Sequence, residues 1–137
     1  MLRTYLAFEA PIAAGPEREA PGREIAEALA QRVSAADPDI KADRVDQHSS
    51  YGWQFELSLQ GVRVWCMLQL PGYSVEADGR ATFVLVTEAR RSFFSRLVGG
   101  EREIPEHRRI CEVLDGAARA TPGVTNARWY TRDEYLK

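Results

Sequence analysis

Hydrophobic and polar residues alternate most regularly between residues 51 and 70, and this pattern predicts a β-hairpin. On the first strand the apolar side chains are those of Tyr51, Trp53, Phe55, Leu57 and Leu59. Alternation resumes with the opposite parity after Gln60 and Gly61, and the apolar side chains are then those of Val62, Val64, Cys66, Leu68 and Leu70. A two-residue turn pairs position 59 with 62 and position 53 with 68, so each apolar residue faces another. Because a slip of one residue would turn the whole set to solvent, the pattern specifies the register.

Further segments predict additional strands, which are residues 2–8, 40–45, 81–87 and 124–131. In the third of these, Phe83 and Leu85 face one way while Val84 and Val86 face the other, which is typical of a central strand covered on both faces. The segment at 40–45 is expected to be a short edge strand. Residues 46–50 are polar and predict a loop.

Two segments have the periodicity of helices. Residues 23–36 place Ile25, Leu29 and Val33 four residues apart, with alanines around them. The second helix is expected to begin near Pro105, a residue suited to the first helical turn. Its apolar stripe consists of Ile110, Val113, Leu114, Ala117 and Ala118. Between these elements, the prolines and glycines of residues 10–22 predict a loop or mobile arm, and residues 90–100 predict an irregular insert.

Together the elements predict an α+β fold with an antiparallel sheet of about four to five strands and two main helices packed on one face. The helices are expected to cover the hairpin face that carries Trp53, Phe55 and Leu57. The 137 residues are expected to form a single domain, because a chain of this length buries roughly 68% of the surface that its unfolded form exposes.

Composition narrows the classes of protein. The net charge is only −2, from 18 basic and 20 acidic residues, so no overall positive field favours nucleic acid. Sixteen of the basic residues are Arg, a bias typical of GC-rich bacterial genomes. Two cysteines do not make a secreted disulfide framework, and a cytoplasmic location is expected. The longest uncharged stretch, residues 64–75, is shorter than the roughly 20 apolar residues of a membrane span.

Candidate metal sites are weak in this sequence. His107 and Cys111 stand four residues apart on the predicted second helix, and His48 with Cys66 could complete a tetrahedral set. Neither CxxC nor HExxH is present, however, and Cys66 belongs to the apolar face of the hairpin. An acidic run at residues 37–46 lacks the Gly and closing Glu of a calcium loop. The sequence therefore predicts no metal, no cofactor and no catalytic residue, so an enzyme is not favoured.

Two segments are candidate partner surfaces. On the second hairpin face, Trp65 and Met67 project beside Arg63 among polar residues, and they are expected either to be covered by a helix or the arm, or to anchor a partner. The insert at 90–100 interleaves arginines with apolar residues, so it could enter a partner groove, bind an anionic surface or cap the core. Its candidate residues are Arg91, Phe93, Phe94 and Arg96.

The functional hypothesis is a non-enzymatic bacterial protein-binding module that acts through one of these surfaces. An alternative is a small-ligand binder or enzyme with a pocket between the sheet and the 71–79 loop. Its candidate lining residues are His48, Trp53, Tyr73, Arg128 and Trp129. Self-association through an unpaired sheet edge is a third possibility.

Apart from the short edge strand expected at 40–45, the element order from residue 23 to residue 131 is helix, three strands, helix and strand, in a compact and slightly acidic chain. This order resembles that of small bacterial secretion chaperones and of immunity-type proteins. The resemblance implies a non-enzymatic protein that acts by binding another protein.

Overall fold

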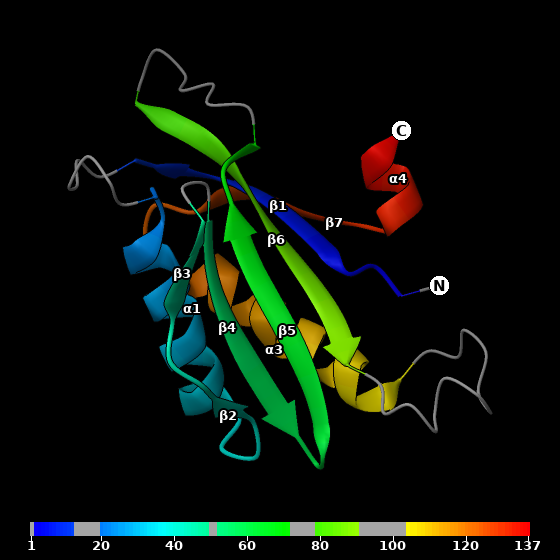
Figure 1. Cartoon of the computed structure of the whole chain (residues 1–137). Coiled ribbons are helices and arrows are strands. Elements are labelled where there is room, and N and C mark those ends of the chain that lie inside the picture. Colours follow the sequence, from blue (N-terminus) through cyan, green and yellow to red (C-terminus); the bar gives the residue numbers. More distant parts are fainter. Residues whose placement is uncertain (1, 13–19, 50–51, 72–78, 91–103) are drawn as a thin grey trace.

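The computed structural model describes residues 2–12, 20–49, 52–71, 79–90 and 104–137. It confirms the α+β class and the antiparallel sheet, but the sheet has seven strands, and the described part of the chain has three helices (Figure 1). The strands are β1 (Tyr5–Pro11), β2 (Lys41–Ala42), β3 (Asp46–Ser49), β4 (Gly52–Leu59), β5 (Val62–Gln69), β6 (Arg80–Arg90) and β7 (Thr125–Tyr130). The helices are α1 (Arg23–Ala36), α3 (Pro105–Ala120) and α4 (Arg132–Leu136). Neighbouring strands follow the order β2-β4-β5-β6-β1-β7, and β3 also pairs with β4.

The hairpin of β4 and β5 has the predicted register. Leu59 is opposite Val62, and the pairing continues without a shift to Trp53 opposite Leu68. The two turn residues have positive φ angles, 50° at Gln60 and 82° at Gly61. Positive angles at both positions are those of a type I′ turn, whose twist matches that of the flanking strands. Local turn geometry and the apolar pattern therefore specify the same pairing.

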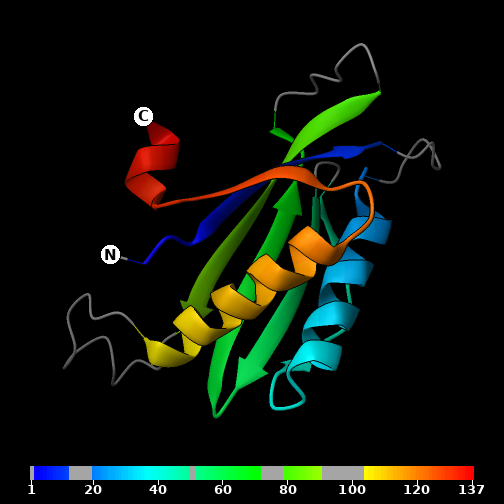
Figure 2. The same ribbon diagram turned by 180° about the vertical axis from the view of Figure 1, so that it is seen from behind.

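Both long helices lie on one face of the sheet, as predicted (Figure 2). α1 buries Leu29 and Val33 there, and α3 buries Ile110 and Leu114. The sheet contributes the inward residues of its central strands, which are Leu6, Phe8, Phe55, Leu57, Val64, Cys66, Leu68, Phe83 and Leu85. Each of these side chains is at most 2% exposed. Burial of this apolar surface stabilises the fold.

The central position of β6 is also confirmed, because it lies between β5 and β1. Phe83 and Leu85 face the helices and are fully buried. Val84 points to the opposite face and is only 1% exposed, and Val86 is partly buried there. The strand is longer than predicted, with 11 residues.

The edge beside β4 differs from the prediction. The polar segment at residues 46–50, expected to be a loop, contains β3, which pairs Asp46 with Gln54 and Gln47 with Trp53. β2 pairs farther along β4, at Ser58 and Leu57, and has only two residues. The chain therefore follows one edge of β4 as an interrupted strand. β3 forms because its backbone pairs with that of β4, not because its side chains are buried. The pattern of hydrophobic and polar residues therefore does not predict it.

Both ends of the predicted arm at residues 10–22 belong to the folded core. β1 extends to Pro11, and the Ile12 amide donates to the Gly79 carbonyl at 3.1 Å. Ala20 is 4% exposed, and its carbonyl accepts a 2.8 Å hydrogen bond from the Trp53 indole. Residues 13–19 lie outside the described residues. The prediction of a loop over 10–22 was therefore wrong at its start, where Ala10 and Pro11 belong to β1, whereas the described residues 20–22 belong to no helix or strand, as a loop requires.

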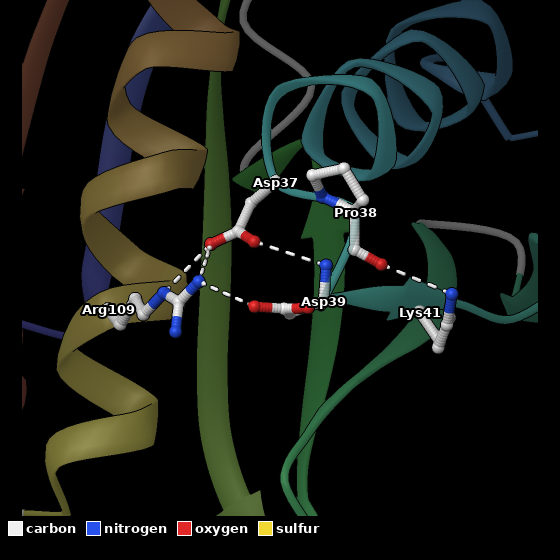
Figure 3. Close-up of polar contacts among 5 residues, drawn as sticks. All are labelled: Asp37, Pro38, Asp39, Lys41 and Arg109. Carbon is white, nitrogen blue, oxygen red and sulfur yellow. Dashed lines mark hydrogen bonds and ion pairs between the residues drawn. The ribbon is translucent and has the colours of Figure 1, made fainter.

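Part of the acidic run at residues 37–46 binds an arginine in the structure (Figure 3). Arg109 of α3 contacts Asp37 at 2.6 Å and Asp39 at 3.3 Å. Hydrogen bonds to Asp37 and Asp39 raise the pKa of Arg109 above its usual value. These two carboxylates connect α3 to the turn that follows α1, which is a structural role rather than a calcium site.

Replacement of Arg109 by alanine should lower the Tm in thermal unfolding followed by circular dichroism. The Asp37 side chain is only 13% exposed, so the variant leaves a mostly buried carboxylate without its cationic partner. Arg44→Ala is the matched control, because Arg44 and Asp46 form a pair with side chains 83% and 49% exposed, and such pairs contribute little. Equal Tm values for the two variants would show that the contact of Arg109 with Asp37 does not stabilise the fold.

Candidate functional site

One face of the sheet is covered by neither α1 nor α3 (Figure 1), although the short α4 packs at one end of it, where Tyr135 contacts Tyr5 and Tyr130. We call it the helix-free face, because neither long helix covers it, and define it by outward residues of the sheet, which are Tyr5, Glu56, Arg63, Trp65, Met67, Val86 and Tyr130. Strand pairing places them together, because Trp65 is opposite Glu56, Met67 is opposite Val86 and Tyr5 is opposite Tyr130. Trp65 and Met67 are partly buried there. The candidate anchors of the hairpin therefore lie on this face.

Trp65 is held in one orientation on the helix-free face. Its indole nitrogen donates to the Gln54 side-chain oxygen at 3.0 Å. The His48 ring lies against it, with ring centroids 5.8 Å apart and planes tilted by 57°. A large aromatic side chain fixed in this way loses little conformational entropy when a partner covers it.

The charged residues of the helix-free face carry both signs. Glu56 accepts ion pairs from Arg63 at 3.8 Å and from Arg90 at 3.5 Å. The Glu56 side chain is 21% exposed, whereas both arginine side chains are more than 60% exposed. The acid is thus neutralised from two neighbouring strands, and the guanidinium groups remain open to solvent. The other candidate partner residues, Arg91, Phe93, Phe94 and Arg96, lie outside the described residues.

The candidate pocket residues are placed in different parts of the fold. Trp53 is 5% exposed and belongs to the core, with Arg23 5.7 Å from its ring centre. His48 lies on β3 and Arg128 on β7, and these strands are at opposite edges of the sheet. Trp129 bonds to Asp115 of α3 on the helix-covered side. The structure therefore does not bring these four together, and Tyr73 lies outside the described residues.

A small cavity of about 350 Å³ surrounds Arg128 at the opposite end of the helix-free face from Arg63. Glu9, Asn126 and Tyr130 also line it. Asn126 has a positive φ angle of 54° and donates to the Glu9 carboxylate at 2.5 Å. This contact lies at the bulge where β1 and β7 lose register, so it has a structural role in joining the two strands.

Three of the four residues considered for a metal share one neighbour beneath α3. Thr87 contacts His107 at 2.8 Å and Cys111 at 3.6 Å, and Cys66 is directly opposite Thr87 on the neighbouring strand. His48 lies on the other face, beside Trp65. Among the described residues no group of three or more potential ligands is arranged for a metal.

Both thiols of this cluster are buried. Burial raises the pKa of Cys66 well above its usual value, and the neighbouring Cys111 adds to this effect. Burial likewise raises the pKa of Cys111 to about 11. Both cysteines are free and buried, so both are protonated near neutral pH and behave as core residues, not as nucleophiles. Thr87, which sequence reasoning did not single out, is the polar centre of this cluster.

A larger cavity of about 880 Å³, which sequence reasoning missed, lies between α3, the end of β7 and the first residues of the chain. We call it the α3–β7 cavity and define it by Arg3, Arg108, Cys111, Glu112, Asp115 and Trp129. The helix residues form a stripe of mostly charged side chains. Such a stripe is typical of a solvated helix face, so only the placement of β7 opposite it marks a cavity.

Two further observations concern membrane-spanning helices and similarity to known proteins. No helix in the described ranges is long and apolar enough to cross a membrane. The longest of them, α3, has 16 residues. No family model, no curated protein and no solved structure matches the chain.

Proposed function

We propose that this chain is a non-enzymatic protein-binding module and that its partner is a second copy of the chain, bound at the helix-free face. The observation that carries the proposal is the one-sided packing of the sheet. α1 and α3 bury one face, whereas the other presents partly buried Trp65 and Met67 without a described helix over them. Two such faces can pack against each other at about 10 Å, as in β-sandwiches.

Trp65 is the expected anchor of this interface. Tryptophan is enriched among the residues that dominate binding energy, particularly near the centre of an interface. β5, which carries Trp65, lies between β4 and β6. Its indole is already oriented by Gln54 and His48, so association requires little further ordering of this side chain.

The charge distribution supports an identical partner. A two-fold interface places the same surface on both subunits, so a face of one sign would repel itself. The helix-free face instead carries Arg63 and Arg90 beside Glu56, with Glu88 opposite Trp65. The two positive and two negative side chains allow opposite charges to meet when two faces pack.

Multi-angle light scattering across a concentration series tests the proposal on the purified chain. The wild type should show a mass twice that of the monomer at high concentration. Trp65→Ala should raise the dimer Kd roughly 30-fold, which corresponds to about 2 kcal/mol at a central anchor. Trp129→Ala is the matched control, because it removes a partly buried tryptophan from the helix-covered side and should leave the dimer Kd unchanged.

Circular dichroism of each variant separates loss of folding from loss of association. A wild-type chain that remains monomeric throughout the series would contradict the proposal. An equal effect of the two tryptophan substitutions on the dimer Kd would show that the helix-free face is not the interface.

A further inference from the structure

The α3–β7 cavity has the size of a small-molecule site and is open to solvent. Its volume of about 880 Å³ falls within the roughly 300–1,000 Å³ of typical ligand pockets. Figure 2 shows the elements that form it, with α3 on one side and β7, α4 and the start of the chain on the other. It lies on the opposite side of the sheet from the helix-free face, so inferences about the two are independent.

The cavity has an apolar wall with a fixed aromatic ring. Trp129 and Leu2 line it from the sheet side, and the buried Cys111 from α3. The Trp129 indole donates to Asp115 at 2.9 Å, so the ring cannot turn freely. Because the Cys111 thiol is protonated near neutral pH, this wall carries no charge.

Most charged side chains around the cavity are already paired. Arg119 binds Asp115 at 2.9 Å and donates to the Ala127 carbonyl at 3.2 Å. Glu134 accepts from the Thr131 amide at 2.8 Å and from Arg3 at 3.3 Å. The lining contains three arginines and three acidic residues. Their charges balance, so the cavity as a whole does not attract a ligand with a net charge of either sign.

Two charged side chains that line the cavity can still bind a ligand. Arg3 contacts Glu134 through Nε alone, so its two terminal nitrogens have no partner among the described residues. Glu112 on α3 forms no hydrogen bond or ion pair within the described part of the chain. One wall thus offers donors suited to a carboxylate, and α3 offers an acceptor suited to an ammonium group.

We propose that the α3–β7 cavity binds a small zwitterion with an apolar side chain, of the class of an α-amino acid or a short peptide. The ligand carboxylate bonds to the terminal nitrogens of Arg3, and the ligand ammonium group bonds to the Glu112 carboxylate. The apolar side chain lies against Trp129 and Leu2. This arrangement satisfies the Arg3 terminal nitrogens and the Glu112 carboxylate, which have no partner among the described residues, and leaves the existing ion pairs of Asp115 and Glu134 in place.

Isothermal titration calorimetry with four probes tests the ligand class. L-phenylalanine represents a free amino acid, and the tripeptide Gly-Phe-Gly represents a peptide. Phenethylamine lacks the carboxylate and 3-phenylpropionate lacks the ammonium group. We expect at least one zwitterion to bind with a Kd below about 1 mM and both single-charge analogues to bind at least tenfold more weakly, since a charge-assisted hydrogen bond contributes more than the 1.4 kcal/mol of a tenfold change.

Two substitutions assign the contacts. Glu112→Gln should weaken the zwitterion at least tenfold and leave 3-phenylpropionate unchanged, whereas Arg3→Gln should weaken both. Arg132→Gln is the control, because Arg132 is exposed and does not line the cavity. The Trp129 indole signal in a nitrogen–proton NMR spectrum should shift with the zwitterion in the wild type, which locates binding independently of the variants.

Binding of neither zwitterion at 10 mM would overturn the proposal. Equal binding of the zwitterions and a single-charge analogue would also overturn it, because one of the two charge contacts would then be absent. A zwitterion that binds without moving the Trp129 signal would place the site elsewhere.

Discussion

Replacement of Phe83 by alanine should lower the free energy of unfolding by about 3–5 kcal/mol, the range measured for buried aromatic residues truncated to alanine. Phe83 is fully buried on β6, the central strand. Its ring stacks on Phe8 with centroids 5.9 Å apart. A β-carbon built on Gly22 would approach it at 3.0 Å. The Phe83 ring is contacted from β1 and from the start of α1. The surrounding residues can therefore move little to fill the cavity that the substitution leaves.

Urea unfolding at equilibrium measures this loss. Thr82→Ala is the matched control, because Thr82 is the exposed neighbour on the same strand; its free energy of unfolding should change by no more than about 0.5 kcal/mol. A loss below about 1 kcal/mol for Phe83→Ala would mean that this ring is not packed at the centre of the core.

Alkaline pH should destabilise the chain through its buried thiols. Burial raises the pKa of Cys111 from 9.0 to about 11 in the folded chain, and a raised pKa means that the folded state holds the proton more tightly than the unfolded state. The associated stability is fully present below pH 9 and is lost as the pH rises through about 11. A difference of this size corresponds to about 3 kcal/mol. The pKa of Cys66 is also raised, so its contribution adds to that loss.

Urea unfolding between pH 8 and pH 11 measures the effect, with Cys111→Ala as the comparison. The variant starts from a lower free energy of unfolding at pH 8 because of the lost volume, but its decline toward pH 11 should be smaller than that of the wild type by about 2 kcal/mol, because part of the loss falls above pH 11. Cys66→Ala should flatten the decline in the same direction. Parallel curves for wild type and Cys111→Ala would show that this thiol is not buried.

The central hairpin, the two long helices and the placement of both helices on one face follow from the sequence. These elements bury a continuous apolar face, so their hydrophobic period is visible in single residues such as Phe55 and Leu114. At the ends of the sheet the signal weakens. β3 forms by backbone pairing with β4, and polar residues such as Gln47 satisfy that requirement as well as apolar ones.

The short helix α4 was missed although the sequence carries a signal for it. Thr131 and Glu134 form a capping box, with hydrogen bonds of 3.1 Å and 2.8 Å between side chain and backbone. The helix has five residues and none of them is buried, so no apolar stripe accompanies the cap. Tyr135 places it against Tyr5, with ring centroids 5.2 Å apart.

The alternation of the sequence by itself determined that Trp65 and Met67 share the face opposite the helices, because period two leaves no other choice once the core face is known. Only the tertiary structure decided what lies around each candidate residue. Neighbours such as Arg3 and Glu112 are far apart in the chain, and they line one cavity because β7 pairs with β1 on the far side of the sheet from β4. Such proximity depends on strand order, which leaves no trace in the local pattern of hydrophobic and polar residues.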